Sequence, residues 1–239
     1  MQKEINMGGL IFRIIIWILT LLLKTYLRLR IGKHIKRWGP IINEARKGLQ
    51  KIRDLKVIRP SLYIIITLEP IQNIRKVIKA TIEYRYTLVN ITGKRIDSSE
   101  FNIEGWCDHL EKSKYFPEDA KILALDIDGH KVDQVDNFIT STKYEEYLCY
   151  PLSFSPNGEH AIRHICQSFY FKHDHYPFNS VYITRKTYIT AKSKVKGLEI
   201  AAYAFNPQKK WETKKKNQWK INNIILPYQG GKVVWKPKN

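Results

Sequence analysis

The sequence lacks the short motifs by which common enzyme classes are recognised. It has no glycine-rich phosphate loop of the Walker or dinucleotide type, no GxSxG, no HExxH and no credible pair of catalytic carboxylates. Cysteine is scarce: Cys107, Cys149 and Cys166 are an odd number without CxxC spacing. A disulfide scaffold is therefore disfavoured, and reduced thiols in a cytosolic domain fit better. We expect a protein that is not an enzyme and has no cofactor and no bound metal.

Acidic residues are also scarce, except in one segment. The 239 residues include 41 Lys and Arg against 22 Asp and Glu, a formal net charge of +19. Residues 1–60 hold 14 basic against 3 acidic residues, residues 100–160 hold 5 against 13, and residues 161–239 hold 16 against 3. This asymmetry favours an anionic partner, either nucleic acid or lipid headgroups. A lysine-rich coding bias is the alternative explanation.

One long hydrophobic run is present, "LIFRIIIWILTLLLKTYLRLR" at residues 10–30. Its apolar length approaches the roughly 20 residues that a bilayer core requires. We interpret residues 1–30 as a membrane anchor in which a helix over about 8–29 spans the bilayer once. An interfacial helix and a buried helix of a soluble protein are the alternatives. A cleaved signal peptide is disfavoured, since the positive charges follow the run instead of preceding it.

Three polar residues of this run, Arg13, Thr20 and Lys24, fall on one stripe of a helix, and the remaining face is apolar. A lone helix would expose these side chains to lipid, so the stripe predicts a homo-oligomer formed through the helix. The basic residues that follow the run place its carboxyl end in the cytoplasm. The N-terminus is then outside the cell membrane and the rest of the chain is cytoplasmic.

Residues 31–60 continue the basic character. After Gly39-Pro40, apolar residues recur at helical spacing as far as Leu55, with Lys and Arg between them. We predict a basic amphipathic connector that ends before Pro60 and lies on anionic headgroups, each Lys or Arg near the surface contributing about 1 kcal/mol. A lipid bilayer is therefore the first expected partner.

From Leu62 the pattern becomes one of short β-branched and aromatic runs, broken by Gly, Pro, Asn and Asp. About ten such runs without helices between them predict that residues 61–239 form a cytosolic domain, an antiparallel β-sandwich or barrel. Pro177 is expected to end a strand, and Gly230-Gly231 to form a turn before an integral last strand. The segment 108–121 reads as a loop or a short helix.

A lysine-rich stretch with interleaved tryptophans, "NPQKKWETKKKNQWK" at residues 206–220, reads as a hairpin loop. Lysine suits phosphate groups and aromatic rings suit stacking, so this loop together with "ITRKTY" is the candidate site for an anionic ligand. The same residues equally suit a membrane interface, where Trp lies at the level of the headgroups. A solvated loop with its two tryptophans paired across the hairpin is the remaining alternative. The candidate residues are Arg185, Lys186, Lys209, Lys210, Trp211, Lys214, Lys215, Lys216 and Trp219.

Two other patterns suggest metal sites but do not match the ligand spacing that such sites require. "DIDGHKVDQVD" fails the ligand spacing of a calcium loop, and Asp128-Gly129 instead predicts a tight hairpin turn. A cluster of imidazoles and a thiol matches no standard zinc spacing, although alternation would put His164 and Cys166 on one face of a strand. The cluster comprises His160, His164, Cys166, His173 and His175.

Taken together, these features predict a membrane-anchored, non-enzymatic sensor or effector whose β domain binds an anionic ligand. In architecture alone the chain resembles small bacterial membrane-tethered proteins with a β-rich cytosolic sensor, and some antiphage effectors of that plan respond to nucleotide signals. That resemblance implies a nucleotide ligand and a role in bacterial defence. The alternative is a soluble basic module that binds nucleic acid, and a hydrolase using the His/Cys cluster ranks third.

Overall fold

A computed structural model of the chain describes residues 56–72, 74–108, 120–142, 145–204, 211–221, 224–227 and 229–238. These residues belong to one compact unit, Asp54–Asn239. The predicted anchor with Arg13, Thr20 and Lys24, the predicted connector as far as Leu55, and nearly all of 108–121 lie outside the described residues. Within the part that is described, no helix is long and apolar enough to cross a bilayer.

The described unit is mainly β, as predicted. Its elements are β1 Val57–Ile71, β2 Ile74–Asn90, β3 Asn102–Asp108, β4 Lys121–Ile127, β5 His130–Lys131, the 3-10 turn η1 Val135–Phe138, β6 Ile139–Ser141, β7 Glu145–Pro151, β8 Glu159–Phe171, β9 Asp174–Asn179, β10 Thr184–Ser193, β11 Leu198–Ala204, β12 Glu212–Lys215, β13 Gln218–Ile221 and β14 Gly230–Pro237. The first strand begins at Val57, so residues 57–60 are extended and are not the end of a helix.

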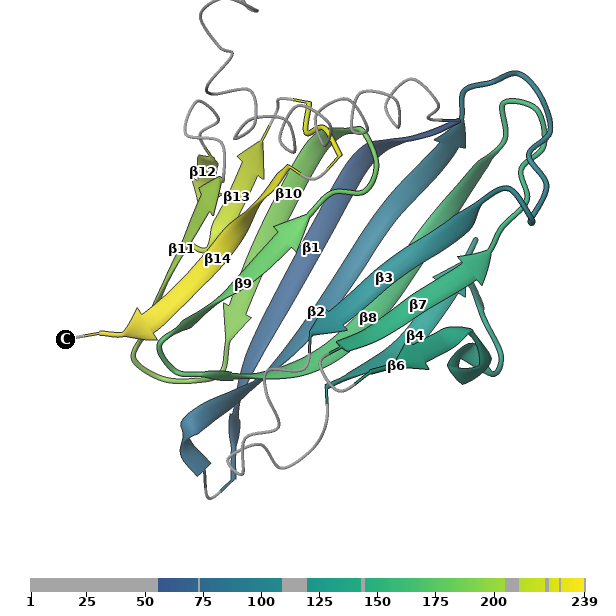
Figure 1. Cartoon of the computed structure of the whole chain (residues 1–239). Coiled ribbons are helices and arrows are strands. Elements are labelled where there is room, and N and C mark those ends of the chain that lie inside the picture. The colour runs from purple at the N-terminus through teal and green to yellow at the C-terminus, as the bar shows by residue number, and fades with distance from the viewer. Residues whose placement is uncertain are drawn as a thin grey trace, which may run out of the picture. The chain divides into compact units, whose positions relative to one another are not determined.

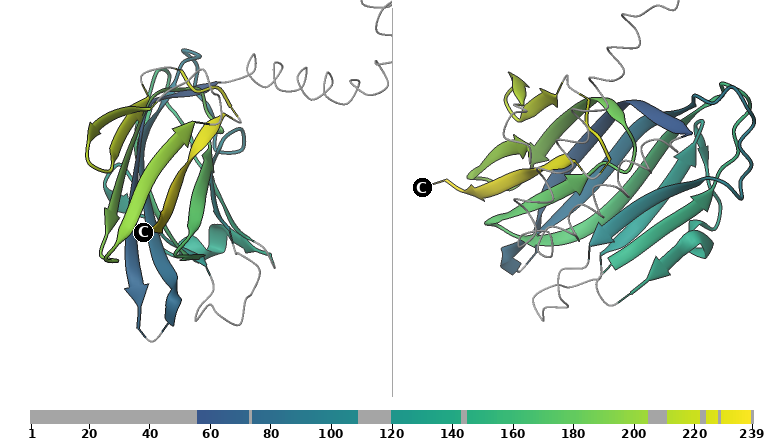
Figure 2. Two further views of the ribbon diagram at one scale, coloured as in Figure 1. Left: turned by 90° about the vertical axis from the view of Figure 1, so that its left-hand side faces the viewer. Right: turned by 45° about the horizontal axis from the view of Figure 1, so that its top comes forward.

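The strands form one large sheet and two small ones. The large sheet has the order β12-β13-β10-β1-β2-β8-β4-β5, and the small sheets have the orders β11-β14-β9 and β3-β7-β6. The two small sheets lie side by side over one face of the large sheet (Figure 1), and Figure 2 shows the same two layers from other directions. The large sheet has edges at β12 and β5 and is not closed into a barrel. Of the two predicted architectures, the β-sandwich therefore describes this unit.

One strand pair departs from the antiparallel prediction. β1 and β10 are parallel, with Tyr63 opposite Tyr188, whereas the other pairs within the described sheets are antiparallel. The chain reaches β10 from β9 in the second layer, so it re-enters the large sheet without a hairpin and can align with β1 in either direction. Sequence spacing alone could not reveal this crossover between layers.

The core lies between the two layers, and alternation of buried and exposed side chains is clearest in the second half of β1. Along β1, the side chains of Leu62, Ile64, Ile66 and Leu68 are buried, while Tyr63 between them is exposed. Trp235 of β14 is fully buried from the other side and donates a hydrogen bond from Nε1 to the carbonyl oxygen of Phe171 at 2.9 Å. Alternation with period two is what a sheet with one covered face requires.

Local turn predictions had mixed outcomes. Asp128 and Gly129 both have positive φ, 53° and 82°, so the predicted hairpin turn between β4 and β5 is confirmed. The predicted turn at Gly230-Gly231 is wrong, since both residues lie inside β14. Glycine is needed at Gly230 because a Cβ there would meet the carbonyl oxygen of Phe178 at 1.8 Å. Pro177 lies within β9, where an edge strand tolerates the missing N–H group.

Candidate ligand-binding cavity

A cavity of about 280 Å³ lies between the two layers, where the second layer changes from one small sheet to the other. Its floor is the inner face of β2 and β8. Its two flanks are β3 and β9, which are the facing edge strands of the two small sheets. Each flank therefore ends in a strand that pairs on one side only. This break in the second layer, and not a loop, gives the cavity its opening.

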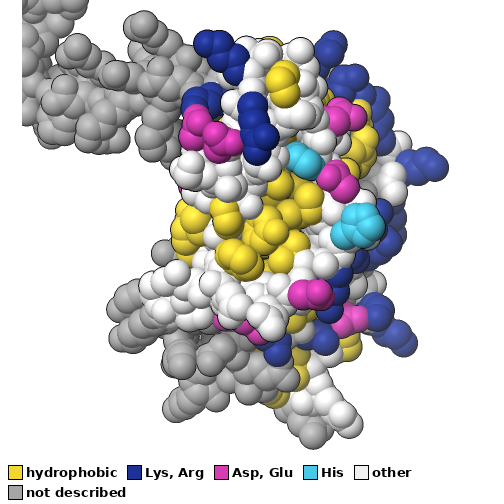
Figure 3. Space-filling view, turned by 90° about the vertical axis from the view of Figure 1, so that its right-hand side faces the viewer, with side chains coloured by type: hydrophobic (Ala, Val, Ile, Leu, Met, Phe, Trp, Pro, Cys, Tyr) yellow, Lys and Arg dark blue, Asp and Glu magenta, His cyan; other side chains and the backbone are white. Residues whose placement is uncertain are grey.

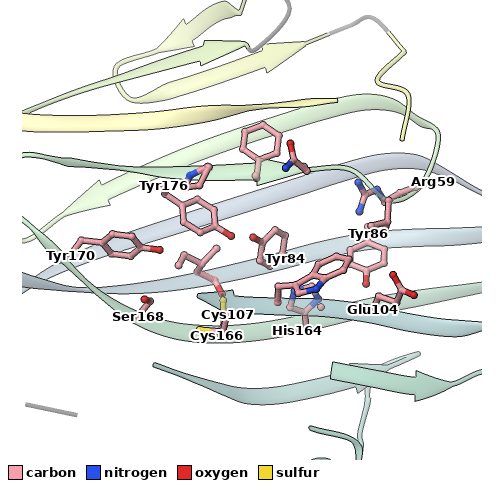
Figure 4. A pocket seen from close by; sticks show the side chains of 17 residues that line it. Arg59, Tyr84, Tyr86, Glu104, Cys107, His164, Cys166, Ser168, Tyr170 and Tyr176 are labelled. Atoms are coloured by element: carbon pink, nitrogen blue, oxygen red, sulfur yellow. The ribbon is translucent and has the colours of Figure 1, made fainter. Parts of the chain in front are cut away.

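The floor is largely aromatic. Tyr84 and His164 are directly opposed in the register of β2 and β8, with stacked rings whose centroids are 4.3 Å apart. Tyr86 meets the edge of His164 at 5.9 Å. Figure 4 shows Tyr170, Tyr176 and the hydroxyl of Ser168 at one end of the cavity and Tyr86 and His164 at the other. Aromatic walls with a few polar groups are typical of sites for small organic ligands.

Arg59 supplies the only buried guanidinium among the described residues. It extends from β1 to the cavity, where its Nε donates to Oγ1 of Thr184 at 2.9 Å and its Nη2 donates to Oγ of Ser180 at 2.7 Å. The rings of Tyr86 and Tyr182 lie 5.2 and 5.5 Å from its guanidinium carbon. Burial lowers the pKa of Arg59 to about 10, so the group remains charged at neutral pH.

This charge has no counter-ion within the described part of the chain. No ion pair joins Arg59 to a carboxylate there, although Glu104 of β3 lines the same end of the cavity. Glu104 instead hydrogen-bonds to Tyr147. A guanidinium has five N–H donors, and only two have described acceptors in the fold. Burying a cation costs several kcal/mol unless an anion compensates, so this end of the cavity is suited to an anionic group.

His164 is the second polar group without a full set of partners. It is buried, and its Nδ1 has no hydrogen-bond partner in the described structure. Burial, followed by repulsion from Arg59, lowers its pKa to about 3. The imidazole is therefore neutral at physiological pH. It contributes a flat ring and a hydrogen-bonding nitrogen, while Arg59 carries the positive charge of the site.

The predicted His/Cys cluster is dispersed by the fold. His164 and Cys166 do share the inner face of β8 and both line the cavity, as alternation predicted. His160 instead contacts Asp128, with Nδ1 2.6 Å from Oδ2, and His173 and His175 are exposed or partly exposed near β9. Among the described residues, no three His, Cys, Asp or Glu side chains converge as metal ligands would.

The candidate residues chosen from sequence lie elsewhere. The fold does place their segments side by side, because β10 pairs with β13 and β13 pairs with β12. Arg185 and Lys186 begin β10, and Lys214 and Lys215 lie on β12 with Lys216 at the following turn. Trp219 is buried, Trp211 packs edge-on against Phe178, and Lys209 and Lys210 lie outside the described residues. None of the described ones lines the cavity.

Sequence reasoning missed Arg59, Tyr84, Tyr86 and Glu104 as site residues. Arg59 stands among many basic residues of the first 60, so its sequence position does not distinguish it. Alternation could not have found it either, because extending the pattern of Leu62 and Ile64 backwards would place Arg59 on the outward face. A β-bulge between Ile58 and Leu62 shifts the phase and turns Arg59 inward, and local sequence does not reveal such a bulge.

Comparison with known proteins gives no family for this chain. No family model matches the sequence, and no curated protein matches it. Solved structures share parts of its shape. An M1 zinc metallopeptidase from Deinococcus radiodurans is 9% identical with a TM-score of 0.38, and the match covers 76% of this chain and 43% of that one.

Two further structures are similar at the same level. A candidate nutrient-binding protein from Legionella pneumophila is 9% identical with a TM-score of 0.43, covering 75% of this chain and 67% of that one. Yeast LTA4 hydrolase is 11% identical with a TM-score of 0.40, covering 75% and 28%. This chain thus spans less than half the length of the two hydrolases. At these values the likeness carries no argument about activity.

Proposed function

We propose that the β domain is a non-enzymatic receptor for a small anionic molecule with an aromatic ring, of the chemical class of a mononucleotide. The observation that supports this is Arg59: a buried, charged guanidinium without a described counter-ion, in the wall of an aromatic cavity. The phosphate of the ligand meets Arg59, and its ring lies against the tyrosines. Glu104 accepts a hydrogen bond from a ligand hydroxyl.

The rest of the proposal concerns the whole chain. Residues 8–29 anchor it in the cell membrane with the N-terminus outside, and residues 31–55 lie on anionic headgroups. The stripe of Arg13, Thr20 and Lys24 joins copies within the bilayer, so ligand binding in the cytoplasm changes an assembly at the membrane. Its support is the hydrophobic run, the positive charge that follows it, and the aromatic cavity with Arg59 in its wall. A role in bacterial defence fits this plan.

The test is calorimetric titration of the full-length chain in detergent micelles with AMP, GMP, CMP and UMP, and with adenosine and inorganic phosphate separately. We expect at least one nucleotide to bind at least tenfold more tightly than either part alone. Arg59→Lys keeps the charge but loses the hydrogen bonds to Thr184 and Ser180 that hold the guanidinium at the cavity. It should weaken that binding at least tenfold, and circular dichroism at the titration temperature must show that the variant is folded.

The matched control is the pair Arg185→Gln and Lys186→Gln, which removes two exposed or partly exposed cations from the site predicted by sequence. Unchanged affinity in this control assigns the ligand to the cavity. If the control variant loses binding and Arg59→Lys does not, the ligand belongs to the lysine-rich strands. If no nucleotide binds, while RNA binds with a steep salt dependence, the soluble nucleic-acid module replaces this proposal.

A further inference from the structure

The fold converts the uneven charge of the sequence into two ends of opposite sign. Strands β10 to β14 come from residues 184–238, which hold 14 Lys and Arg against 2 Asp and Glu. Strands β4 to β7 with η1 come from residues 121–151, which hold 6 Asp and Glu against 3 Lys. We call the described surface of β10–β14 the basic end, and that of β4–β7 with η1 the acidic end.

These two ends lie at opposite edges of the molecule. In the large sheet β12 and β13 form one edge, and β4 and β5 form the other. The small sheet containing β11 and β14 covers the first half, and the one containing β6 and β7 covers the second (Figure 1). With neighbouring strands about 4.8 Å apart, eight strands separate the edges by roughly 30 Å. Charges at the two ends therefore cannot neutralise each other within one copy.

Part of the charge at each end is free of ion pairs within the described residues, although Asp126 and Asp128 at the acidic end contact Arg163 and His160. At the basic end Lys214 is paired with Glu212, but Lys215 and Lys216 beside it are exposed and have no such partner. At the acidic end Asp133 and Asp136, before and within η1, are exposed and have none either. Each end thus presents charge that a complementary surface could neutralise.

Both ends also expose apolar surface beside this charge. At the basic end Tyr203 of β11 is 53% exposed, and it borders a groove that Trp211 and Lys216 also line. At the acidic end Leu123 is exposed, and Val132, Phe138 and Ile139 are partly exposed. Figure 3 looks onto this second end and shows hydrophobic side chains gathered in its centre, with acidic, basic and histidine side chains around them. An apolar centre with a charged rim is the usual composition of a protein interface.

We propose that copies of this chain associate head to tail, the basic end of one copy against the acidic end of the next. The contact is heterologous: the two surfaces differ, so each added copy leaves one free end of each sign. Opposite charges orient the encounter, and Tyr203 packs against the apolar centre of the acidic end. This contact involves only the β domain, and it is independent of both the membrane stripe and the cavity.

The test uses the full-length chain in membranes and a carbodiimide, which joins a lysine to a carboxylate only where they touch. A crosslink between Lys215 or Lys216 and Asp133 or Asp136 must connect two copies, because the ends of one copy are roughly 30 Å apart. We expect a ladder of crosslinked species containing these links. The double variant Lys215→Glu/Lys216→Glu and the double variant Asp133→Lys/Asp136→Lys should each reduce the ladder at least tenfold.

The decisive arm is co-expression of these two variants with different affinity tags. One variant then has two acidic ends and the other two basic ends, so the mixture should restore the ladder with the tags alternating. Arg75→Glu/Lys76→Glu near the β1–β2 turn makes the same charge change away from both ends and should leave the ladder intact. An unaltered ladder in the single-end variants overturns the proposal, as does a mixture that does not restore the ladder although both variants keep the wild-type melting temperature.

Discussion

The ring of His164 stacks on the ring of Tyr84 across β2 and β8, with centroids 4.3 Å apart and planes inclined by 25°. This pair forms part of the cavity floor and joins two neighbouring strands of the large sheet. Because the Nδ1 atom of His164 has no described partner and the ring is buried, the pair is stable only while the imidazole is neutral. The same residue therefore links the ligand site to the acid stability of the domain.

The first prediction concerns that acid stability. Burial holds the pKa of His164 at about 3 in the folded chain, whereas an unfolded histidine titrates near 6.5. Between these values only the unfolded state takes up the proton, so the free energy of unfolding falls as the pH falls from 6.5 towards 3. At pH 4.5 the loss attributable to His164 is about 2–3 kcal/mol relative to neutral pH. His164→Phe should show correspondingly less acid destabilisation in urea titrations.

The control for this prediction is His173→Gln, which removes an exposed histidine near β9. It should retain the wild-type difference in unfolding free energy between pH 7 and pH 4.5. Carboxylates that titrate in the same range affect all three chains equally and cancel in the comparison. A His164→Phe chain whose acid destabilisation equals that of wild type would show that this imidazole is protonated in the folded state.

The second prediction compares two glycine-to-alanine substitutions, one expected to affect ligand binding and the other the stability of the fold. A Cβ at Gly105 would lie 3.6 Å from Cβ of Leu148 and 3.7 Å from Nε2 of His164, which are ordinary contacts. Gly105→Ala should therefore keep the free energy of unfolding within about 1 kcal/mol while narrowing the cavity and weakening nucleotide binding. A Cβ at Gly230 would meet the carbonyl oxygen of Phe178 at 1.8 Å. Gly230→Ala should cost about 3 kcal/mol or more in chemical denaturation.

Gly230 lies in a strand and not in the predicted turn, which shows why the sequence predicted the elements better than the contacts between them. Alternation along "SLYIIITLE" predicted a strand with one buried face, and Leu62 to Leu68 are buried as it requires. "DG" between two strand patterns predicted a turn, and Asp128-Gly129 forms it. "GG" after a proline carries the same local signal, yet these glycines are needed for the close approach of β9 to β14, which local sequence does not encode.

The cavity could not be predicted for a related reason. Its floor comes from β2 and β8, which are adjacent in the sheet but about 80 residues apart at Tyr84 and His164, and Arg59 reaches it from a third strand. Sequence reasoning therefore favoured residues that are close in sequence, the lysines of 206–220. The sequence showed which segments are acidic and which are basic. That they lie at opposite edges of the large sheet depends on the strand order, which the sequence did not predict.

The third prediction concerns the last strand. Trp235 is fully buried, stands edge-on to Tyr170 with centroids 5.2 Å apart, and donates to the carbonyl oxygen of Phe171. Trp235→Ala should lower the free energy of unfolding by about 3–5 kcal/mol. A chain that ends before Gly230 removes the central strand of a three-stranded sheet and should show no cooperative thermal transition. A chain ending after Lys238 keeps the hydrogen bond from the Lys238 N–H to the carbonyl oxygen of Gly197 and should melt as the full-length chain does.

The last prediction concerns the membrane anchor. Insertion of a helix with Arg13 at its centre costs roughly 2.5–3.5 kcal/mol, which the strongly apolar residues offset at about 0.3–0.6 kcal/mol each. The full-length chain should therefore stay in the pellet when membranes are extracted with alkaline carbonate, and a chain lacking residues 1–30 should be released. Arg13→Leu should stay in the pellet but form smaller oligomers, because it strengthens insertion while removing the polar contact of the stripe.

Oligomers of unchanged size would show that the stripe does not join copies, without affecting the prediction of insertion. Release of the full-length chain would instead make residues 10–30 peripheral or buried, and the nucleic-acid alternative would then take precedence.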